Sequence, residues 1–229
     1  MKLIRYFSIF ELLLWSFSVI CIVISFLLFD RVNWVNIISP VIGVTSILLN
    51  AKGNPLGQLL MLVFSVFYGV ISFHFAYYGE MITYLGMTAP MAVLALISWL
   101  RNPFRGKKSE VAVNHISKKE GVFAFLLSGV VTVVFYFILR QLGTAHLLPS
   151  TLSVFTSFLA VYLVFRRSEW FSLAYAANDA VLIVLWILAS FESMSYISVV
   201  ICFVMFLFND VYAFLSWRKM KRRQQLFKD

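Results

Sequence analysis

Long, uninterrupted stretches of apolar residues constrain what this chain can fold into more than any other feature. A helix that crosses the hydrocarbon core of a bilayer needs about 20 predominantly apolar residues. The sequence contains eight stretches near that length, which we predict to be transmembrane helices: residues 9–29, 35–50, 55–77, 80–100, 120–139, 148–165, 169–191 and 195–217. Because the apolar runs are continuous rather than alternating, they exclude an outer-membrane barrel.

The composition supports an all-α membrane protein. Of the 229 residues, 62% are hydrophobic and 13% are charged, whereas a soluble domain has roughly 45–50% apolar and about 25% charged residues. This excludes a disordered chain, a disulfide scaffold and a soluble nucleic-acid-binding protein, despite the net charge of +9. Cys21 and Cys202 lie inside apolar runs and are predicted to be buried thiols. The first apolar run lacks a small-residue cleavage site and is predicted to be a retained helix.

The basic residues predict the orientation of the chain in the membrane. With eight spans and both termini in the cytoplasm, 17 of the 19 lysines and arginines face the cytoplasm. Only Arg31 and Arg140 face the other side. This asymmetry follows the positive-inside rule, and it explains the positive net charge without a nucleic-acid partner.

The sequence also repeats itself at a shift of 118 residues. Ten identities relate residues 63–101 to residues 181–219, and Trp99 with Trp217 is one of these pairs. A displacement of four spans is even, so both copies run in the same direction through the membrane. We therefore predict two parallel three-helix repeats.

The predicted organisation has five parts along the chain. They are an extra N-terminal transmembrane helix (1–33), a first three-helix repeat (34–101), a basic cytoplasmic loop with a linker helix (102–147), a second three-helix repeat (148–218) and a basic cytoplasmic tail (219–229). Parallel repeats of this kind occur in SWEET-type carriers, where the substrate lies between the repeats near the midplane. The architecture favours a transporter.

Polar side chains within the predicted spans are candidates for a substrate site, because an amide or carboxyl group at bilayer depth is costly unless it faces a cavity. Amides, carboxyls and aromatic rings with polar tips stand out: Asn54, Gln58, Tyr68, Tyr84, Tyr175, Asn178, Asp179, Trp186, Asn209 and Asp210. Alternatives stay open for three of them. Asn54 is also placed to cap a helix, and Asp179 and Asp210 are also suited to a structural pair or a proton relay.

The chemistry of these residues indicates binding rather than catalysis. The sequence has no Ser-His-Asp set and no phosphate-binding loop, and its three histidines are scattered, so we predict no enzyme, no metal and no cofactor. Amides and aromatic rings favour an uncharged or weakly charged ring compound with hydroxyls, such as a nucleoside or a related vitamin. A lipid-modifying membrane enzyme and a non-transporting scaffold are the competing classes.

Four short segments are shared with a known family. They are Ala51-Lys52-Gly53-Asn54-Pro55 leading into Gln58, Tyr78-Gly79-Glu80-Met81, Trp99, and Arg166-Arg167-Ser168-Glu169-Trp170. Over residues 37–219 the chain resembles the PnuC family of bacterial nicotinamide riboside and vitamin transporters. The resemblance implies a SWEET-like build in the bacterial cell membrane, facilitated diffusion and a possible homotrimer. It also implies that intracellular phosphorylation of the substrate drives net uptake.

The resemblance bears on the substrate as well. An amide pair of the family matches Asn54 and Gln58. Nicotinamide riboside transporters of the family usually carry Trp-x-x-Trp on the seventh helix, whereas this sequence reads Ser172-Leu-Ala-Tyr175, which adds Ser172 to the candidate site. A deoxynucleoside and nicotinamide riboside are therefore the leading substrates. Thiamine, riboflavin and proton-coupled transport through Asp179 are alternatives.

Overall fold

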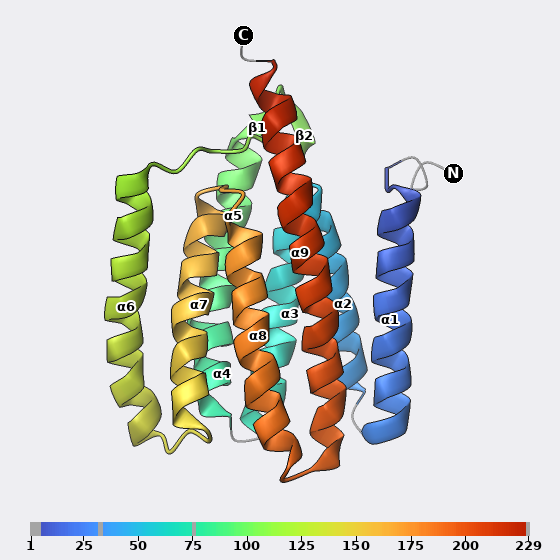
Figure 1. The fold of residues 1–229 in the computed structure, drawn as a ribbon, viewed down its shortest axis with the longest axis vertical. Helices are drawn as coiled ribbons and strands as arrows, with labels where there is room; N and C mark the ends of the chain where they lie inside the picture. Colours follow the sequence, from blue (N-terminus) through green and yellow to red (C-terminus); the bar gives the residue numbers. More distant parts are fainter. Residues whose placement is uncertain (1–5, 32–33, 75–76, 228–229) are drawn as a thin grey trace.

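The chain folds into a bundle of helices that stand side by side (Figure 1). The computed structural model describes residues 6–31, 34–74 and 77–227. In chain order its elements are α1 (Ile9–Phe29), α2 (Val35–Ala51), α3 (Leu56–His74), α4 (Tyr78–Ile82), the π-helix η1 (Thr83–Thr88), α5 (Ala89–Arg101), β1 (Pro103–Phe104), β2 (Lys107–Val111), α6 (Lys118–Gln141), α7 (Leu147–Phe165), α8 (Phe171–Ser190), the 3-10 helix η2 (Met194–Tyr196) and α9 (Ile197–Gln225).

The helices match the eight predicted spans. Seven helical segments in the described part of the chain are long and apolar enough to cross a membrane, and one of them is the continuous run of α4, η1 and α5 (Tyr78–Arg101). The eighth, α2, has 17 residues and lies alongside the others (Figure 1). Since successive spans run in opposite directions, α2, α3 and α5 have the same directions as α7, α8 and α9.

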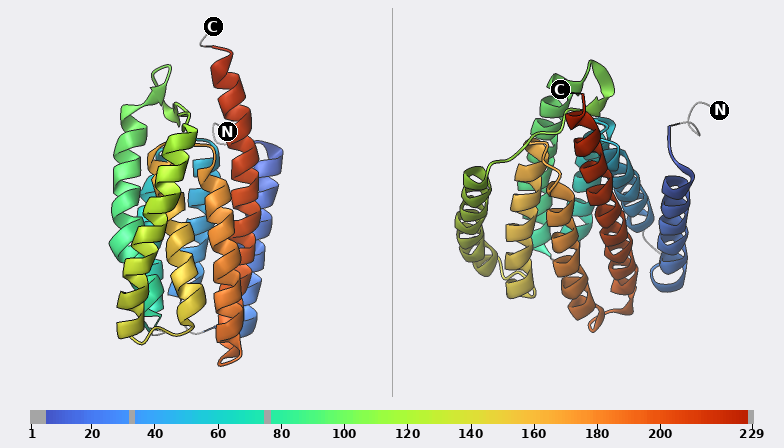
Figure 2. Two further views of the ribbon diagram at one scale, coloured as in Figure 1. Left: turned by 60° about the vertical axis from the view of Figure 1, so that its left-hand side comes forward. Right: turned by 45° about the horizontal axis from the view of Figure 1, so that its top comes forward.

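The two ends of the bundle differ in chemistry. One end holds the β1–β2 hairpin, the start of α1 and the C-terminal end of α9, and we call it the basic end because Lys52, Arg101 and Arg166 also lie there (Figures 1 and 2). The other end holds the end of α3, the start of α4, and the turns between α6 and α7 and between α8 and α9, and we call it the far end (Figure 1).

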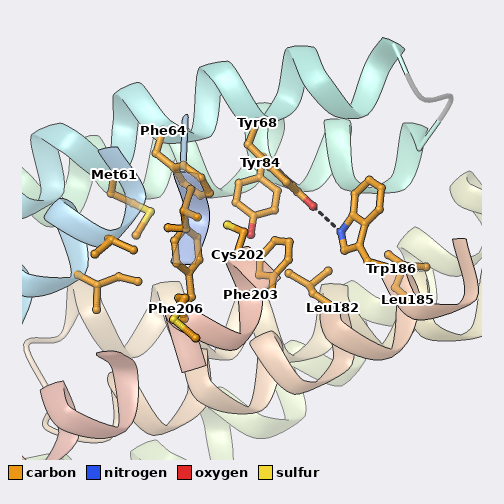
Figure 3. Packing of buried hydrophobic residues seen from close by; sticks show 14 of the residues in the cluster. Met61, Phe64, Tyr68, Tyr84, Leu182, Leu185, Trp186, Cys202, Phe203 and Phe206 are labelled. Atoms are coloured by element: carbon orange, nitrogen blue, oxygen red, sulfur yellow. Dashed lines mark hydrogen bonds between the residues drawn. The ribbon is translucent and has the colours of Figure 1, made fainter. Parts of the chain in front are cut away.

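Buried apolar side chains form two core clusters, and the second of them includes Trp99 of α5 and Trp217 of α9. Large apolar side chains of α2, α3, α8 and α9 form most of the first cluster, which includes Phe64, Trp186 and Phe206 (Figure 3). By contrast, α1 and α6 stand at the two sides of the bundle (Figure 1), and only 22% and 17% of their apolar windows are buried. These two helices therefore expose their apolar side chains in the way that lipid-facing helices do.

A small hairpin at the basic end was not predicted. β1 and β2 pair antiparallel within the loop that follows α5. The backbone N–H of Val111 donates to the Gly53 carbonyl at 2.9 Å, and the side-chain Nε2 of Gln224 donates to the Val111 carbonyl at 3.0 Å. Gln224 is available because α9 continues to Gln225, beyond the predicted end at residue 217. The hairpin thus docks onto the α2–α3 turn and onto the extension of α9.

A wide helical turn interrupts the fourth span. Residues Thr83–Thr88 form a π-helix, a rare conformation that is common at functional sites. Pro90 follows it and supplies no backbone N–H, so the regular ladder of hydrogen bonds cannot continue through this position. The π-helical turn places Tyr84 and Thr88 on the inner face of the bundle, where both are buried.

Candidate functional site

A small cavity lies between the helices of the bundle, and we call it the central chamber. Its lining residues come from α2, α3, η1, α7, α8 and α9: Gly43, Ile47, Asn50, Met61, Phe64, Tyr84, Thr88, Ser157, Phe171, Tyr175, Asn178, Asp179, Phe206 and Asp210. The spacing follows the helical period, since Gly43, Ile47 and Asn50 share one face of α2. The enclosed volume is about 20 Å³, which is room for about one water molecule. The chamber is therefore closed around a space smaller than any nucleoside.

Two carboxyl groups face each other across the chamber. Asp179 on α8 and Asp210 on α9 are both buried, and their side chains are within hydrogen-bonding reach of each other. Two carboxyl groups can hydrogen-bond only when at least one of them keeps its proton, so the bonded pair carries at most one negative charge. None of the lining residues in the described part of the chain is a lysine, an arginine or a histidine. A negative charge in this chamber has no protein cation beside it.

Two amides line the chamber from opposite sides. The Asn178 Oδ1 accepts hydrogen bonds from Thr156 Oγ1 at 2.8 Å and Ser157 Oγ at 2.9 Å, both on α7. These bonds fix the orientation of the Asn178 amide. Its oxygen accepts from α7, and its Nδ2 makes no hydrogen bond to another described residue, so it can donate to a ligand. On α2, the Asn50 Oδ1 accepts a hydrogen bond from Gln58 Nε2 at 2.8 Å. Gln58 itself does not line the chamber, and it acts on the chamber by orienting Asn50.

Aromatic rings close the chamber toward the far end. The Phe64 ring centroid lies 5.8 Å from that of Tyr84 and 5.5 Å from that of Phe206, and both contacts are edge-to-face. Figure 3 shows these rings beside Tyr68 and Phe203, and we call the five rings the aromatic plug. Ring faces and edges of this kind suit a flat heterocycle, and the ring faces attract a positive charge.

A second hollow lies on the other side of the aromatic plug. It also encloses about 20 Å³, and Phe64 and Tyr68 line it together with Asn36 and Ser39 of α2. The Tyr68 hydroxyl accepts a hydrogen bond from Trp186 Nε1 at 2.9 Å (Figure 3). Tyr68 is therefore a ring of the aromatic plug that does not line the central chamber, and Trp186 hydrogen-bonds to it. Tyr84 also belongs to the plug, but it lines the central chamber.

The remaining predicted site residues lie outside the chamber. Asn54 caps α3, because its Oδ1 accepts a hydrogen bond from the Leu56 amide at 3.0 Å. Asn209 Nδ2 donates to Ser18 Oγ of α1 at 2.8 Å and so ties the N-terminal helix to α9. Ser172 is buried but does not line the chamber.

Several chamber residues were missed by sequence reasoning. Asn50 is the last but one residue of α2, and a polar amide at such a position indicates the end of a helix rather than a binding site. Phe64, Phe171 and Phe206 are three of 24 phenylalanines, and most of the others give the same apolar signal. Thr88 was detectable only through the π-helical turn, which has no sequence signature of its own. Within the described residues, no group of three or more His, Cys, Asp or Glu side chains is placed to hold a metal ion.

Comparisons with known proteins bear on the family and the fold of the chain. A sequence model of the family described as "Nicotinamide mononucleotide transporter" matches residues 33–219. The "Nicotinamide riboside transporter PnuC" of Neisseria mucosa is 26% identical over 200 residues, which make up 85% of this chain and 76% of that protein. A solved structure described as "Crystal structure of the Vitamin B3 transporter PnuC" superposes with a TM-score of 0.82 at 22% identity, covering 95% of this chain and 94% of the other. The superposition confirms the predicted all-α transmembrane fold.

Proposed function

The chain belongs to the nicotinamide mononucleotide transporter family, a family of membrane transporters rather than enzymes, and we propose that it carries nicotinamide riboside through the central chamber. The resemblance to PnuC proteins seen in the sequence is thereby confirmed. The choice of nicotinamide riboside among the substrates of such proteins rests on the chemistry of the chamber.

The carboxyl pair carries this proposal. Nicotinamide riboside has a permanently positive pyridinium ring, and one negative charge shared by Asp179 and Asp210 would neutralise it in a water-poor site. The same charge repels the phosphate of a mononucleotide, so we favour the riboside over the nucleotide. A neutral deoxynucleoside would leave the charge unpaired, which is costly at this depth.

Aromatic rings in the chamber supply a stacking surface for the pyridinium ring. Phe64, Tyr84 and Phe206 reach the chamber from three different elements, and Tyr175 lies on α8 one turn before Asp179. Thiamine is the second candidate, because its thiazolium ring is also permanently positive and pairs with the same carboxyl groups.

We further propose that transport is facilitated diffusion in a bacterial cell membrane, with the basic end in the cytoplasm. Intracellular phosphorylation would then remove the imported riboside and sustain net uptake, since the acidic chamber does not readmit the phosphorylated product. The chamber as it stands is too small for this substrate, so the helices that line it must separate during each transport cycle. A homotrimer, which the family resemblance implies, would give three separate chambers.

Reconstituted transport tests the proposal. Proteoliposomes that contain the purified chain should equilibrate labelled nicotinamide riboside without an ion gradient, and unlabelled thiamine should compete better than thymidine or nicotinamide mononucleotide. The double variant Asp179→Asn/Asp210→Asn should lower the affinity for the riboside by roughly tenfold or more, because it removes the negative charge that either carboxyl group alone could still carry. Glu192→Gln, an exposed carboxyl at the far end, is the matched control and should leave uptake unchanged. Uptake of thymidine in preference to the riboside would refute the choice of substrate.

A further inference from the structure

A much larger pocket opens at the basic end of the bundle, and it shares no lining residue with the central chamber. It has a volume of about 410 Å³, and its polar lining comes from four segments of the chain that are far apart in sequence. Tyr6 precedes α1, Lys52 ends α2, Ser109 lies on β2, and Lys219 lies on α9. We call this cavity the basic pocket.

Three cations line the basic pocket against one carboxylate. Lys52, Lys219 and Arg223 are the cations, and Glu110 is the carboxylate. Arg223 forms an ion pair with Glu110, and Lys52 forms one with Glu11 of α1 at 3.1 Å. Among the described residues Lys219 has no ion pair and no hydrogen bond from its side chain, so the pocket has an excess of positive charge.

Three polar side chains of α9 line the pocket together. Ser216, Lys219 and Arg223 follow one another at intervals of three and four residues, which places them on one face of the helix. The Ser216 hydroxyl donates to the Ala51 carbonyl at 2.7 Å, and its oxygen can still accept. The ammonium group and the guanidinium group are one turn apart on this face, a spacing that lets both reach the same anion.

The opposite wall of the pocket supplies further hydrogen-bond donors, from Lys52 and Tyr6. A lysine ammonium group has three N–H donors, and Lys52 donates one hydrogen bond to Glu11. Burial raises the pKa of the Tyr6 phenol above its usual value, so Tyr6 stays neutral and keeps its hydroxyl proton. That hydroxyl accepts a hydrogen bond from Asn54 Nδ2 at 3.1 Å and lies 3.5 Å from the Ser109 carbonyl.

We propose that the basic pocket binds a phosphate group, presented by a soluble phosphomonoester or by the headgroup of an anionic lipid. Phosphate oxygens accept charge-assisted hydrogen bonds from lysine and arginine, and a guanidinium group offers two donors side by side. The preference is opposite to that of the central chamber, whose carboxyl pair repels phosphate. This binding site does not depend on which substrate the chamber carries.

Occupancy of the pocket would stabilise the folded chain. A phosphate held there bridges the segment before α1, the end of α2, the β1–β2 hairpin and α9, so it binds the folded arrangement and not the unfolded chain. Lys219 should contribute most, because it is the cation with no competing carboxylate. Its replacement should therefore separate ligand binding from folding.

Phosphate binding to the purified chain tests the proposal. Radiolabelled inorganic phosphate and adenosine monophosphate are measured by equilibrium dialysis in a neutral detergent, with chloride keeping the ionic strength constant. We expect saturable binding that Lys219→Gln weakens about tenfold, as expected for loss of one charge-assisted contact. Lys119→Gln removes an exposed lysine at the same end, outside the pocket, and should bind phosphate normally.

Nanodiscs distinguish the two sources of phosphate. In discs of phosphatidylcholine the soluble ligands should bind, whereas in discs that contain phosphatidic acid a lipid occupant would displace them from wild type and protect it against thermal unfolding. That protection should be absent for Lys219→Gln. The proposal is overturned if neither soluble phosphate nor phosphatidic acid binds, or if Lys219→Gln and Lys119→Gln weaken binding equally.

Discussion

The chamber residues fall into those that meet a ligand and those that hold them in place. Asp179, Asp210 and Asn178 project into the chamber, and the sequence singles them out because polar groups are rare in apolar spans. Gln58 was singled out for the same reason, yet it contacts Asn50 instead of the chamber. A sequence shows that a polar group is buried, but the face on which it lies depends on how neighbouring helices are rotated.

Gln58 should therefore affect binding indirectly. In Gln58→Ala the Asn50 Oδ1 loses its 2.8 Å donor, and a buried acceptor without a partner costs about 1–3 kcal/mol. We expect Asn50 to reorient and the affinity for nicotinamide riboside to fall by roughly threefold to tenfold, as measured by ligand-dependent thermal stabilisation. Gln141→Ala, at an exposed position of α6, is the control. An unchanged affinity in Gln58→Ala would show that Asn50 does not depend on Gln58.

Gly43 is a position at which added side-chain volume would disturb the central chamber. A Cβ atom built at Gly43 would lie 2.4 Å from Cζ of Phe206, so the ring must move into the chamber or away from it. Gly43→Ala should lower stability by about 1–3 kcal/mol and slow transport, because overpacking displaces a ring of the aromatic plug. Gly129→Ala, where nothing lies within 4 Å of the new Cβ, is the matched helical control and should retain both. Equal unfolding midpoints for the two variants would contradict this reading of the packing.

At the scale of the elements, the helices were predictable and the irregular parts were not. Each span is an apolar stretch of sufficient length, which is a local property that the sequence displays directly. The β1–β2 hairpin forms because Val111 meets Gly53 and Gln224, residues more than 50 and 110 positions away. The π-helical turn likewise depends on the fit of η1 against its neighbours: a Cβ at Gly69 of α3 would lie 2.5 Å from the Leu85 side chain.

The hydrogen bonds between the two sets of helices support the proposed repeat. Trp99 on α5 donates from Nε1 to the Val164 carbonyl at the end of α7, and Trp217 on α9 donates in the same way to the Asn50 carbonyl at the end of α2. Each tryptophan thus caps the first helix of the other set. The two indole rings also contact each other, with centroids 5.4 Å apart.

This reciprocal arrangement predicts matched effects of substitution. Trp99→Phe and Trp217→Phe each keep an aromatic ring and remove one buried hydrogen bond, which should lower the free energy of unfolding by about 1–2 kcal/mol. Because each indole donates one buried hydrogen bond to a carbonyl at the end of a helix, the unfolding midpoints of the two variants should fall by similar amounts in the same detergent. Trp170→Phe, at a partly exposed position outside this arrangement, should change stability little. A large loss for one variant and none for its counterpart would argue against two equivalent halves.

For the whole molecule, the distribution of charge predicts the orientation. We expect the basic end in the cytoplasm, since it carries most of the lysines and arginines. In a variant without Cys21 and Cys202, Ser193→Cys at the far end should react with a membrane-impermeant maleimide in intact cells. Lys118→Cys at the basic end should react only after the cells are permeabilised. Both positions are exposed, so burial does not explain a difference in labelling, and the reverse pattern would invert the topology.

The charge of the substrate links the chamber to the membrane potential. If a positive riboside crosses alone, each transport event moves one elementary charge, which is worth about 2.3 kcal/mol per 100 mV and drives on the order of 50-fold accumulation. If the proton shared by Asp179 and Asp210 leaves as the riboside enters, the exchange is electroneutral and follows the pH gradient instead. Proteoliposomes with an inside-negative potassium diffusion potential separate the two cases. We expect accumulation that rises with the potential and vanishes when valinomycin is omitted, as facilitated diffusion of a cation requires. Uptake that ignores the potential and responds to an imposed pH gradient would instead assign the carboxyl pair to proton exchange.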